Sequence, residues 1–308
     1  MLFDLIIVGA GPAGMTAAIY AARRKLNFFV VSMDIGGQMA WSSEVENYPG
    51  TTHSSGAELT RSFQKHMEIY KIKIKREEVA SISKKGKFCV VKTKKQSYKA
   101  KAVIIASGKS PRKLNVPGEE KLFGKGLSYC AVCDAPLYKD KIVAVIGGGN
   151  SGLEASLFLA KYAKRVYILE LMEKLMGEPY LRDKVLKDKK IEIITGAKVK
   201  EVFGKNSVEA FSYEKNGKEN KLDVNGLFVE IGLLTKTGFT NVKKNKWGEI
   251  MIFRSTRSND ENLTSVPGIF AAGDVTDIPA EQIIAAAGEG CKAALAAFDY
   301  IHRWERKE

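Results

Sequence analysis

The sequence lacks long apolar runs: none approaches the ~18 residues that a membrane-spanning helix requires. Its start also lacks a basic region followed by an apolar stretch and a small-residue cleavage site, so no secretory signal is expected. We therefore expect a cytoplasmic protein with no membrane partner. In that compartment a closely spaced cysteine pair is more often catalytic or metal-binding than a structural staple.

Cysteine and histidine are both scarce, with four and three residues in the chain of 308. Cys130 and Cys133 form a CxxC pair followed by Asp134, which could be a redox dithiol, half of a metal site, or two buried cysteines. A structural zinc needs about four ligands, and the remaining cysteines and histidines show no ligand spacing. Cys89 and Cys291 lie in apolar patterns typical of core residues. No metal is expected.

Acidic residues are outnumbered by basic ones: the chain has 35 Asp and Glu and 49 Lys and Arg, which gives a net charge of +14. Many lysines fall between residues 71 and 101, where they alternate with Ile, Val and Phe. That alternation predicts β-strands with one wet face, hence a solvated basic surface rather than a nucleic-acid site. An acidic protein partner is the remaining possibility.

Two glycine loops are present in a chain long enough for two domains. GAGPAG at residues 9–14 follows an apolar strand and precedes an alanine-rich helix, in GxGxxG spacing. GGGNSG at residues 147–152 repeats this layout, and each copy later ends in an apolar strand closed by glycine, VIIASG and LFVEIG. Such loops let backbone approach a pyrophosphate at a helix N-terminus. The repeat predicts an α/β chain with two nucleotide-binding units.

The residue expected to bind the ribose of the nucleotide differs between the two glycine-loop units. In the second, the strand RVYILE ends at Glu170, about 20 residues beyond the glycines, where a carboxylate accepts a 2′-hydroxyl and repels a 2′-phosphate. No arginine cluster follows it, which favours NADH over NADPH. In the first copy Asp34 stands near the position expected for the ribose-binding acid. Backbone groups of the following GGQ could bind the ribose instead, so Asp34 is assigned no role.

The order GAGPAG, GGQ, ENYPG, CxxCD, GGGNSG and FAAGDVTD resembles the low-molecular-weight thioredoxin reductases over essentially the whole chain. The nucleotide half is also similar to the flavoprotein subunit of alkyl hydroperoxide reductase, which normally carries an additional N-terminal thioredoxin-like domain. With none expected here, the electron acceptor would be a separate protein. The resemblance implies two Rossmann-like domains of the three-layer ββα type, a homodimer, and the cofactors FAD and NADH or NADPH.

The resemblance implies a discontinuous FAD-binding domain, residues 1–112 and 244–308, with an NAD(P)H-binding domain, residues 113–243, inserted into it. It also implies that Gln282 and Ile283 begin the last helix beside the flavin. Many relatives carry Arg before this glutamine and the peroxide-type relatives carry Lys, whereas this chain has Glu281. The implied FAD-binding residues are Gly9, Gly11, Pro12, Ala13, Gly14, Gln38, Asn47, Gly273, Asp274, Gln282 and Ile283. The implied NAD(P)H-binding residues are Gly147, Gly149, Asn150, Ser151, Gly152 and Glu170.

For the dithiol, the resemblance implies that Cys133 is the flavin-proximal sulfur and that Cys130 attacks the partner's disulfide. Asp134 would be the acid that protonates a thiolate, which requires partial burial to raise its pKa. The expected activity is reduction of a thioredoxin or glutaredoxin-like protein. Two alternatives keep the dithiol: an enzyme with reduced ferredoxin or deazaflavin as donor, and a reductase of a peroxidase's carrier protein. A metal- or nucleic-acid-binding module is disfavoured by the two nucleotide loops.

Overall fold

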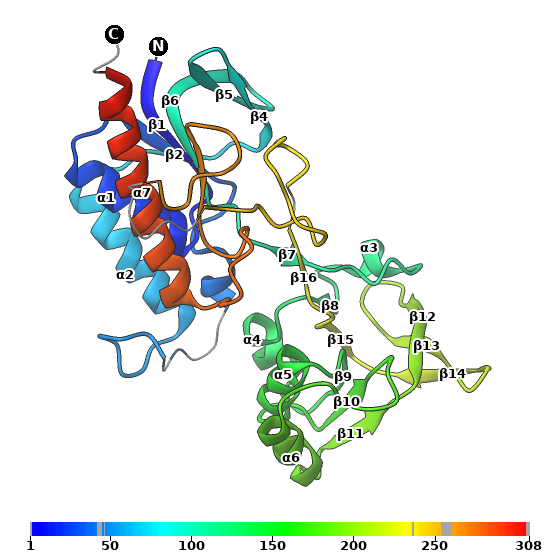
Figure 1. Cartoon of the computed structure of the whole chain (residues 1–308). Coiled ribbons are helices and arrows are strands. Elements are labelled where there is room, and N and C mark those ends of the chain that lie inside the picture. The colour runs from blue at the N-terminus through cyan, green and yellow to red at the C-terminus, as the bar shows by residue number, and fades with distance from the viewer. Residues whose placement is uncertain (1, 42–44, 46, 236, 254–259, 306–308) are drawn as a thin grey trace. The chain divides into compact units, whose positions relative to one another are not determined.

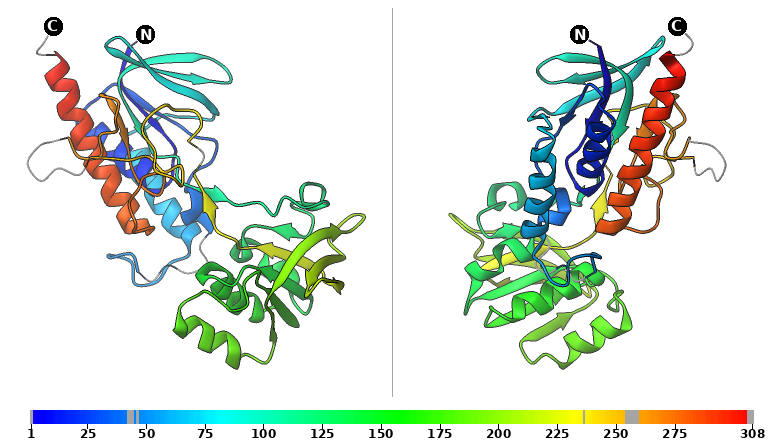
Figure 2. Two further views of the ribbon diagram at one scale, coloured as in Figure 1. Left: turned by 45° about the vertical axis from the view of Figure 1, so that its right-hand side comes forward. Right: turned by 90° about the vertical axis from the view of Figure 1, so that its left-hand side faces the viewer.

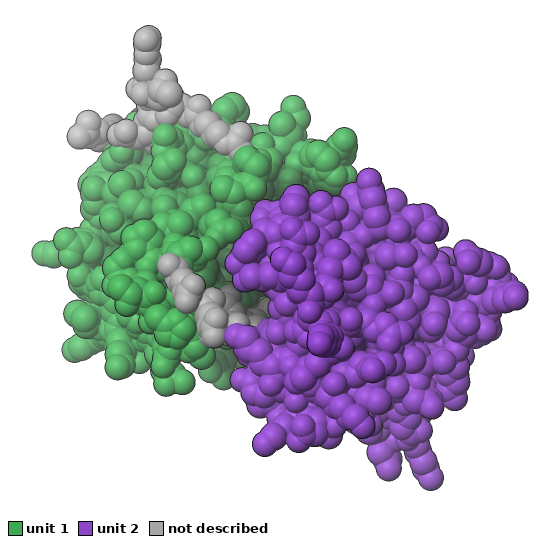
Figure 3. Space-filling model, turned by 90° about the horizontal axis from the view of Figure 1, so that it is seen from below, with its two compact units in different colours: residues 1–110, 234–308 green, residues 111–233 purple. Residues whose placement is uncertain are grey.

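The computed structural model describes residues 2–41, 45, 47–235, 237–253 and 260–305. The chain forms two compact units, residues 1–110 with 234–308 and residues 111–233, coloured separately in Figure 3. The first unit is therefore discontinuous, and the second is inserted into it. Among the described residues, no helix is long and apolar enough to cross a membrane.

The first unit is built on a seven-stranded sheet in the order β3-β2-β1-β6-β5-β4, with β17 also pairing with β6. Strands β3, β2, β1, β6 and β17 run parallel, whereas β4, β5 and β6 pair antiparallel. The basic stretch between residues 71 and 101 thus forms strands, as its alternation predicts. The strands are β1 (Leu2–Val8), β2 (Phe28–Val31), β3 (Ile74–Lys75), β4 (Val79–Lys85), β5 (Phe88–Thr93), β6 (Ser97–Ile105) and β17 (Ile269–Ala271).

Three helices pack together in this unit: α1 (Pro12–Arg23), α2 (Gly56–Ile69) and α7 (Ile283–Glu305). Figures 1 and 2 show them beside one another along the sheet. Small residues allow the close approach, because the buried faces of α1 and α7 consist mostly of alanine. A short 3-10 helix, η1 (Gly37–Trp41), precedes α2. The last helix begins at Ile283, where the family resemblance places its start.

A second apolar cluster of this unit includes Val242 and Ile250, which reach it from the segment after residue 234. Ile82 on β4 donates its N–H to the carbonyl of Phe239, at 2.6 Å. These contacts assign the segment around Phe239 and Val242 to the first unit. The second boundary predicted from the sequence lies after residue 243, whereas the inserted unit ends at Leu233.

The inserted unit contains a five-stranded parallel sheet in the order β11-β10-β9-β15-β8 and a three-stranded antiparallel sheet, β12-β13-β14. Its strands are β8 (Leu127–Ser128), β9 (Ile142–Ile146), β10 (Arg165–Leu169), β11 (Ile191–Ile194), β12 (Ala197–Phe203), β13 (Ala210–Lys215), β14 (Lys218–Asp223) and β15 (Gly226–Val229). Its helices are α3 (Glu119–Leu122), α4 (Ala131–Asp134), η2 (Ala135–Tyr138), α5 (Asn150–Ala160) and α6 (Pro179–Lys187).

Separate apolar clusters join the parallel sheet to its two neighbouring layers. One cluster packs Ala144 and Leu227 of the parallel sheet with Val199 and Phe211 of the antiparallel sheet. Another packs Val145 with residues of α5. This arrangement gives the unit a helix layer, a parallel sheet and an antiparallel sheet. Two short strands, β7 (Ser110–Pro111) and β16 (Leu233–Leu234), pair where the chain passes from one unit to the other.

Candidate active site

The first glycine loop joins β1 to α1 in a turn that only glycine fits. Gly9 has φ +108°, and a Cβ there would lie 2.1 Å from the carbonyl oxygen of Ala106. A Cβ on Gly14 would lie 2.0 Å from the carbonyl oxygen of Gly9. The loop therefore packs closely against the end of β6 and brings the first turn of α1 onto the strand end.

The N-terminus of α1 is suited to an anion. Its N-cap is Gly11, no described side chain caps it, and its first turn carries no acidic residue. Pro12 occupies the first helical turn, where its missing N–H is no loss. The N–H groups of Ala13 and Gly14 and the positive end of the helix dipole are thus available to a pyrophosphate.

The first loop is also tied to the end of β2. Ser32, which is buried, accepts a hydrogen bond from the N–H of Ala10 at 3.2 Å. Gly36 donates its N–H to the carbonyl of Ala10 at 2.8 Å. A neutral hydroxyl therefore stands where many nucleotide-binding units place a carboxylate.

Four of the predicted flavin residues lie in two contacting pairs, although each pair is far apart in sequence. Gln38 Nε2 lies 3.5 Å from Asp274 Oδ2, and Asn47 Nδ2 donates to Gln282 Oε1 at 3.0 Å. Gly273 has φ +77°, and a Cβ there would lie 3.0 Å from the Cβ of Ala13. The FAAGD turn is therefore packed onto the first glycine loop.

Burial raises the pKa of the Asp274 carboxyl above its usual value, and the Glu281 carboxylate adds to that rise. Glu281 is paired with Lys109, which also contacts Glu249 at 2.8 Å. The Lys109 side chain is 9% exposed. Burial lowers its pKa, but the bonds to the two glutamates outweigh this, so the pKa of Lys109 is raised. Sequence reasoning missed Lys109, because nothing near it in the chain reveals its partners.

The second glycine loop repeats the geometry of the first, between β9 and α5. Gly147 has φ +119°, and a Cβ there would lie 2.1 Å from the carbonyl oxygen of Glu230. A Cβ on Gly152 would lie 2.0 Å from the carbonyl oxygen of Gly147. The N-cap of α5 is Gly149, with no described side chain capping it and no acid in its first turn.

Polar side chains beside the second loop hold its surroundings in place. Asn150 Oδ1 accepts the N–H of Glu178 at 2.7 Å, which fixes the start of α6 against α5, and the neighbouring Ser151 is exposed. Glu154 lies one turn further along α5. Burial and the charge of Glu178 raise the pKa of Glu154.

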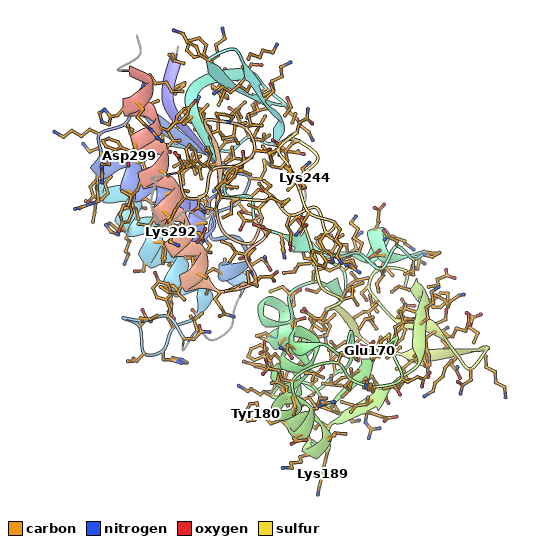
Figure 4. The ribbon with its side chains drawn as sticks, in the orientation of Figure 1. Glu170, Tyr180, Lys189, Lys244, Lys292 and Asp299 are labelled. Carbon is orange, nitrogen blue, oxygen red and sulfur yellow. The ribbon has the colours of Figure 1, made fainter. Side chains whose placement is uncertain are left out.

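Glu170 follows β10 directly and is 8% exposed. Its Oε2 accepts the N–H of Gly148 at 2.6 Å, and its Oε1 accepts the N–H of Met172 at 2.8 Å. The carboxylate thus lies against the glycine loop, and Figure 4 shows Glu170 within the second unit. Each oxygen keeps a further lone pair for a ribose hydroxyl.

The CxxC segment begins at Cys130, two residues after the end of β8. The hydroxyl of Ser128 accepts the N–H of Cys130 at 3.0 Å and lies 3.3 Å from its carbonyl, which fixes the backbone at this cysteine. Cys130 is half-buried, and Cys133 lies on α4 with its side chain outside the described residues. Asp134, half-buried, ends α4. The remaining cysteines are free, with Cys89 buried on β5 and Cys291 half-buried on α7.

These features define a two-domain dinucleotide-binding oxidoreductase, since each unit presents an uncapped helix behind a glycine loop and the second adds a cysteine pair. The family model for pyridine nucleotide-disulphide oxidoreductases matches residues 3–290, and the chain belongs to that family. Membership implies FAD and a pyridine nucleotide as cofactors. The two glycine loops fit such groups, because both leave helix N-termini open to phosphate.

The chain is similar to an alkyl hydroperoxide reductase component of Staphylococcus aureus (strain NCTC 8325 / PS 47), with 42% identity over 307 residues. That match covers 98% of this chain but only 59% of the relative's length. The fold is similar to that of T. acidophilum thioredoxin reductase, with 40% identity, a TM-score of 0.84 and coverage of 97% and 98% of the two chains. It is also similar to that of Lactococcus lactis thioredoxin reductase, with 32% identity, a TM-score of 0.85 and coverage of 98% and 99%.

Proposed function

We propose that the chain passes electrons from NADH through FAD to a disulfide formed by Cys130 and Cys133, and then to a thioredoxin-like protein. Bound FAD would supply the two-electron step between the nicotinamide and the disulfide. The observation that carries the proposal is the placement of the CxxC turn. It follows β8 at the same sheet edge as the second glycine loop, in a chain with a further glycine loop for a second dinucleotide.

Each part of the chain has a distinct task in this proposal. The loop at Gly9–Gly14 would bind the FAD pyrophosphate, and Asp274 and Gln38 would bind the ribityl chain and flavin surroundings. The loop at Gly147–Gly152 would bind the pyrophosphate of NADH. Cys130 would attack the partner's disulfide while Asp134 holds the proton required by the departing thiolate.

The preference for NADH rests on Glu170. Its carboxylate is buried against the glycine loop, so a ribose 2′-phosphate would be brought close to a poorly solvated negative charge. A ribose 2′-hydroxyl would instead donate to one of its oxygens. We therefore expect NADH to be the better donor.

The experiment is an anaerobic titration of the FAD-loaded protein with NADH and, separately, NADPH, followed by flavin absorbance. NADH should bleach the flavin at a lower concentration than NADPH. Glu170→Gln should reduce the ratio of the two half-bleaching concentrations by about tenfold, which corresponds to about 1.4 kcal/mol. Glu192→Gln is the matched control, because it removes the same charge from an exposed site on β11. Bleaching by dithionite but by neither nucleotide would replace this proposal with ferredoxin or deazaflavin as donor.

A second candidate acceptor is the carrier protein of a peroxidase, favoured by the 42% identity to an alkyl hydroperoxide reductase component. The two acceptors are distinguished by steady-state reduction of a purified thioredoxin and a purified peroxidase carrier domain under the same conditions. The preferred acceptor should show the larger kcat/KM. Cys130→Ser should abolish transfer to either one. Assembly as a homodimer stays a prediction.

A further inference from the structure

Glu230 lies between the dithiol turn and the second glycine loop. Strands β8 and β15 pair in parallel with Ser128 opposite Phe228, and β15 pairs with β9 with Val229 opposite Ile146. The carboxyl ends of parallel strands meet at one edge of the sheet. The residues just beyond these strands, Cys130, Glu230 and Gly147, therefore follow one another along that edge.

The contacts of Glu230 connect it to both neighbours. The Ala131 N–H donates a hydrogen bond to the Glu230 carboxyl. On the other side, the Glu230 N–H donates to the carbonyl of Ile146 at 2.8 Å, and its own carbonyl packs against the backbone of Gly147. One residue thus contacts the backbone of the CxxC segment and that of the glycine loop.

We propose that Glu230 is a positioning residue for the dithiol, holding the turn at Cys130 and Ala131 against the sheet edge and setting the electrostatic field at the cysteines. The inference rests on the proposed dithiol function. Residue 131 lies between the two cysteines, so a hydrogen bond to its N–H fixes the backbone that must place both sulfurs. A negative carboxylate at this place disfavours a nearby thiolate.

The described elements around Glu230 carry no compensating cation. None of the elements at this edge, β8, α4, η2, β9, α5 and β15, contains a lysine or arginine. Their titratable groups are Asp134, Tyr138 and Glu154, besides Cys133 on α4 and the adjoining Cys130.

Burial raises the pKa of Glu230 to about 7, the charge of Glu154 adds to the rise, and the bond from Ala131 opposes it. The carboxyl therefore changes charge near neutral pH. Below that pH it is neutral and adds no negative charge beside the cysteines. Above it the anion opposes thiolate formation.

The test measures alkylation of Cys130 by iodoacetamide between pH 5.5 and 9, site by site, by peptide mass spectrometry. The full chain is first reduced with dithiothreitol and desalted, and no nucleotide is added. Glu230→Gln should alkylate about three- to tenfold faster than wild type at pH 8, equivalent to half to one unit in the thiol pKa. The inflection near pH 7 should disappear, because glutamine does not titrate. Glu192→Gln should follow the wild-type profile.

Glu230→Asp provides a second variant, which keeps the charge but shortens the reach to Ala131. The pH profile of this variant should retain an inflection, while its alkylation rate should differ from that of wild type. If circular dichroism shows that Glu230→Gln does not fold, Glu230→Asp is used in its place. Superposed profiles for wild type and the Glu230 variants would overturn the proposal. Because dithiothreitol reduces the cysteines directly, this outcome is separate from failure of the proposed function, which would appear as a flavin that nucleotides do not reduce.

Discussion

The contact between α1 and α7 depends on Gly290, and we predict that alanine at this position forces the two helices apart. A Cβ on Gly290 would lie 2.0 Å from the carbonyl oxygen of Ala13 and 2.9 Å from its Cα. Both contacts involve backbone, which cannot rotate away as a side chain can. One helix must therefore shift by about 1 Å in an interior packed to crystal-like density.

Gly288 on the same helix supplies the control, because the structure shows open space where its Cβ would be. Alanine at either position gains about 1 kcal/mol of helix propensity over glycine. Only Gly290→Ala also incurs the cost of overpacking, typically about 1–3 kcal/mol. The free energy of unfolding should thus differ by about 1–3 kcal/mol between the two variants. With roughly 2–4 °C per kcal/mol for a unit of this size, Gly290→Ala should melt about 2–12 °C below Gly288→Ala.

The assay is thermal unfolding of the full chain by circular dichroism, in one buffer, with and without saturating FAD. The FAD-dependent rise in Tm should also shrink in Gly290→Ala, because Ala13 belongs to the loop proposed to bind the pyrophosphate. Gly288→Ala should melt at or above the wild-type temperature. Equal melting temperatures for the two variants would refute the reasoning that backbone contact at Ala13 limits this helix pair.

Two further predictions concern buried charges in the first unit. Burial raises the pKa of Glu77, but hydrogen bonds from Thr93 and Tyr98 outweigh it, and the net pKa is lowered. The resulting stabilisation is present above the unfolded-state pKa of about 4.5 and is lost as pH falls through the folded value. Urea unfolding should therefore show Glu77→Gln less stable by about 1–3 kcal/mol at pH 7, with the deficit shrinking below pH 4.5. Lys109→Met should lower the free energy of unfolding by about 1–3 kcal/mol, because it removes the ion-pair partner of Glu249 and Glu281. Adding Glu281→Gln should recover part of this loss, and no recovery would show that Lys109 and Glu281 are not coupled.

Short-range patterns explain most of what could be predicted from the sequence. The two glycine loops and the strand before each follow from residue order within about ten positions, whereas the start of α7 at Ile283 follows from the family resemblance. The fold requires glycine at positions 9 and 147, because both residues have positive φ and there is no room for a Cβ. Alternation between residues 71 and 101 likewise indicates strands without any knowledge of their neighbours.

Pairings between distant segments could not be predicted in the same way. Lys109 and Glu281 are neighbours in space only because the end of β6 and the start of α7 meet in the folded unit. Viewed alone, Glu281 is an acid where the family resemblance leads us to expect a base. The structure shows that the positive charge is present nearby, supplied by Lys109 from another segment. The unit boundary at Leu233 was missed for the same reason, since Phe239 reveals its place only through its bond to Ile82.

The two glycine loops also show where the two halves of the chain differ. Ala10 and Gly148 occupy equivalent positions, and each donates its N–H to the side chain that follows the next strand, Ser32 in one unit and Glu170 in the other. The backbone requirement is therefore the same in both. The acceptors differ in charge, so the proposed discrimination between a plain and a phosphorylated ribose rests on Glu170, and Ser32 provides no equivalent charge. A repeated loop with a neutral acceptor in one copy and an anionic acceptor in the other is expected for two sites that bind different dinucleotides.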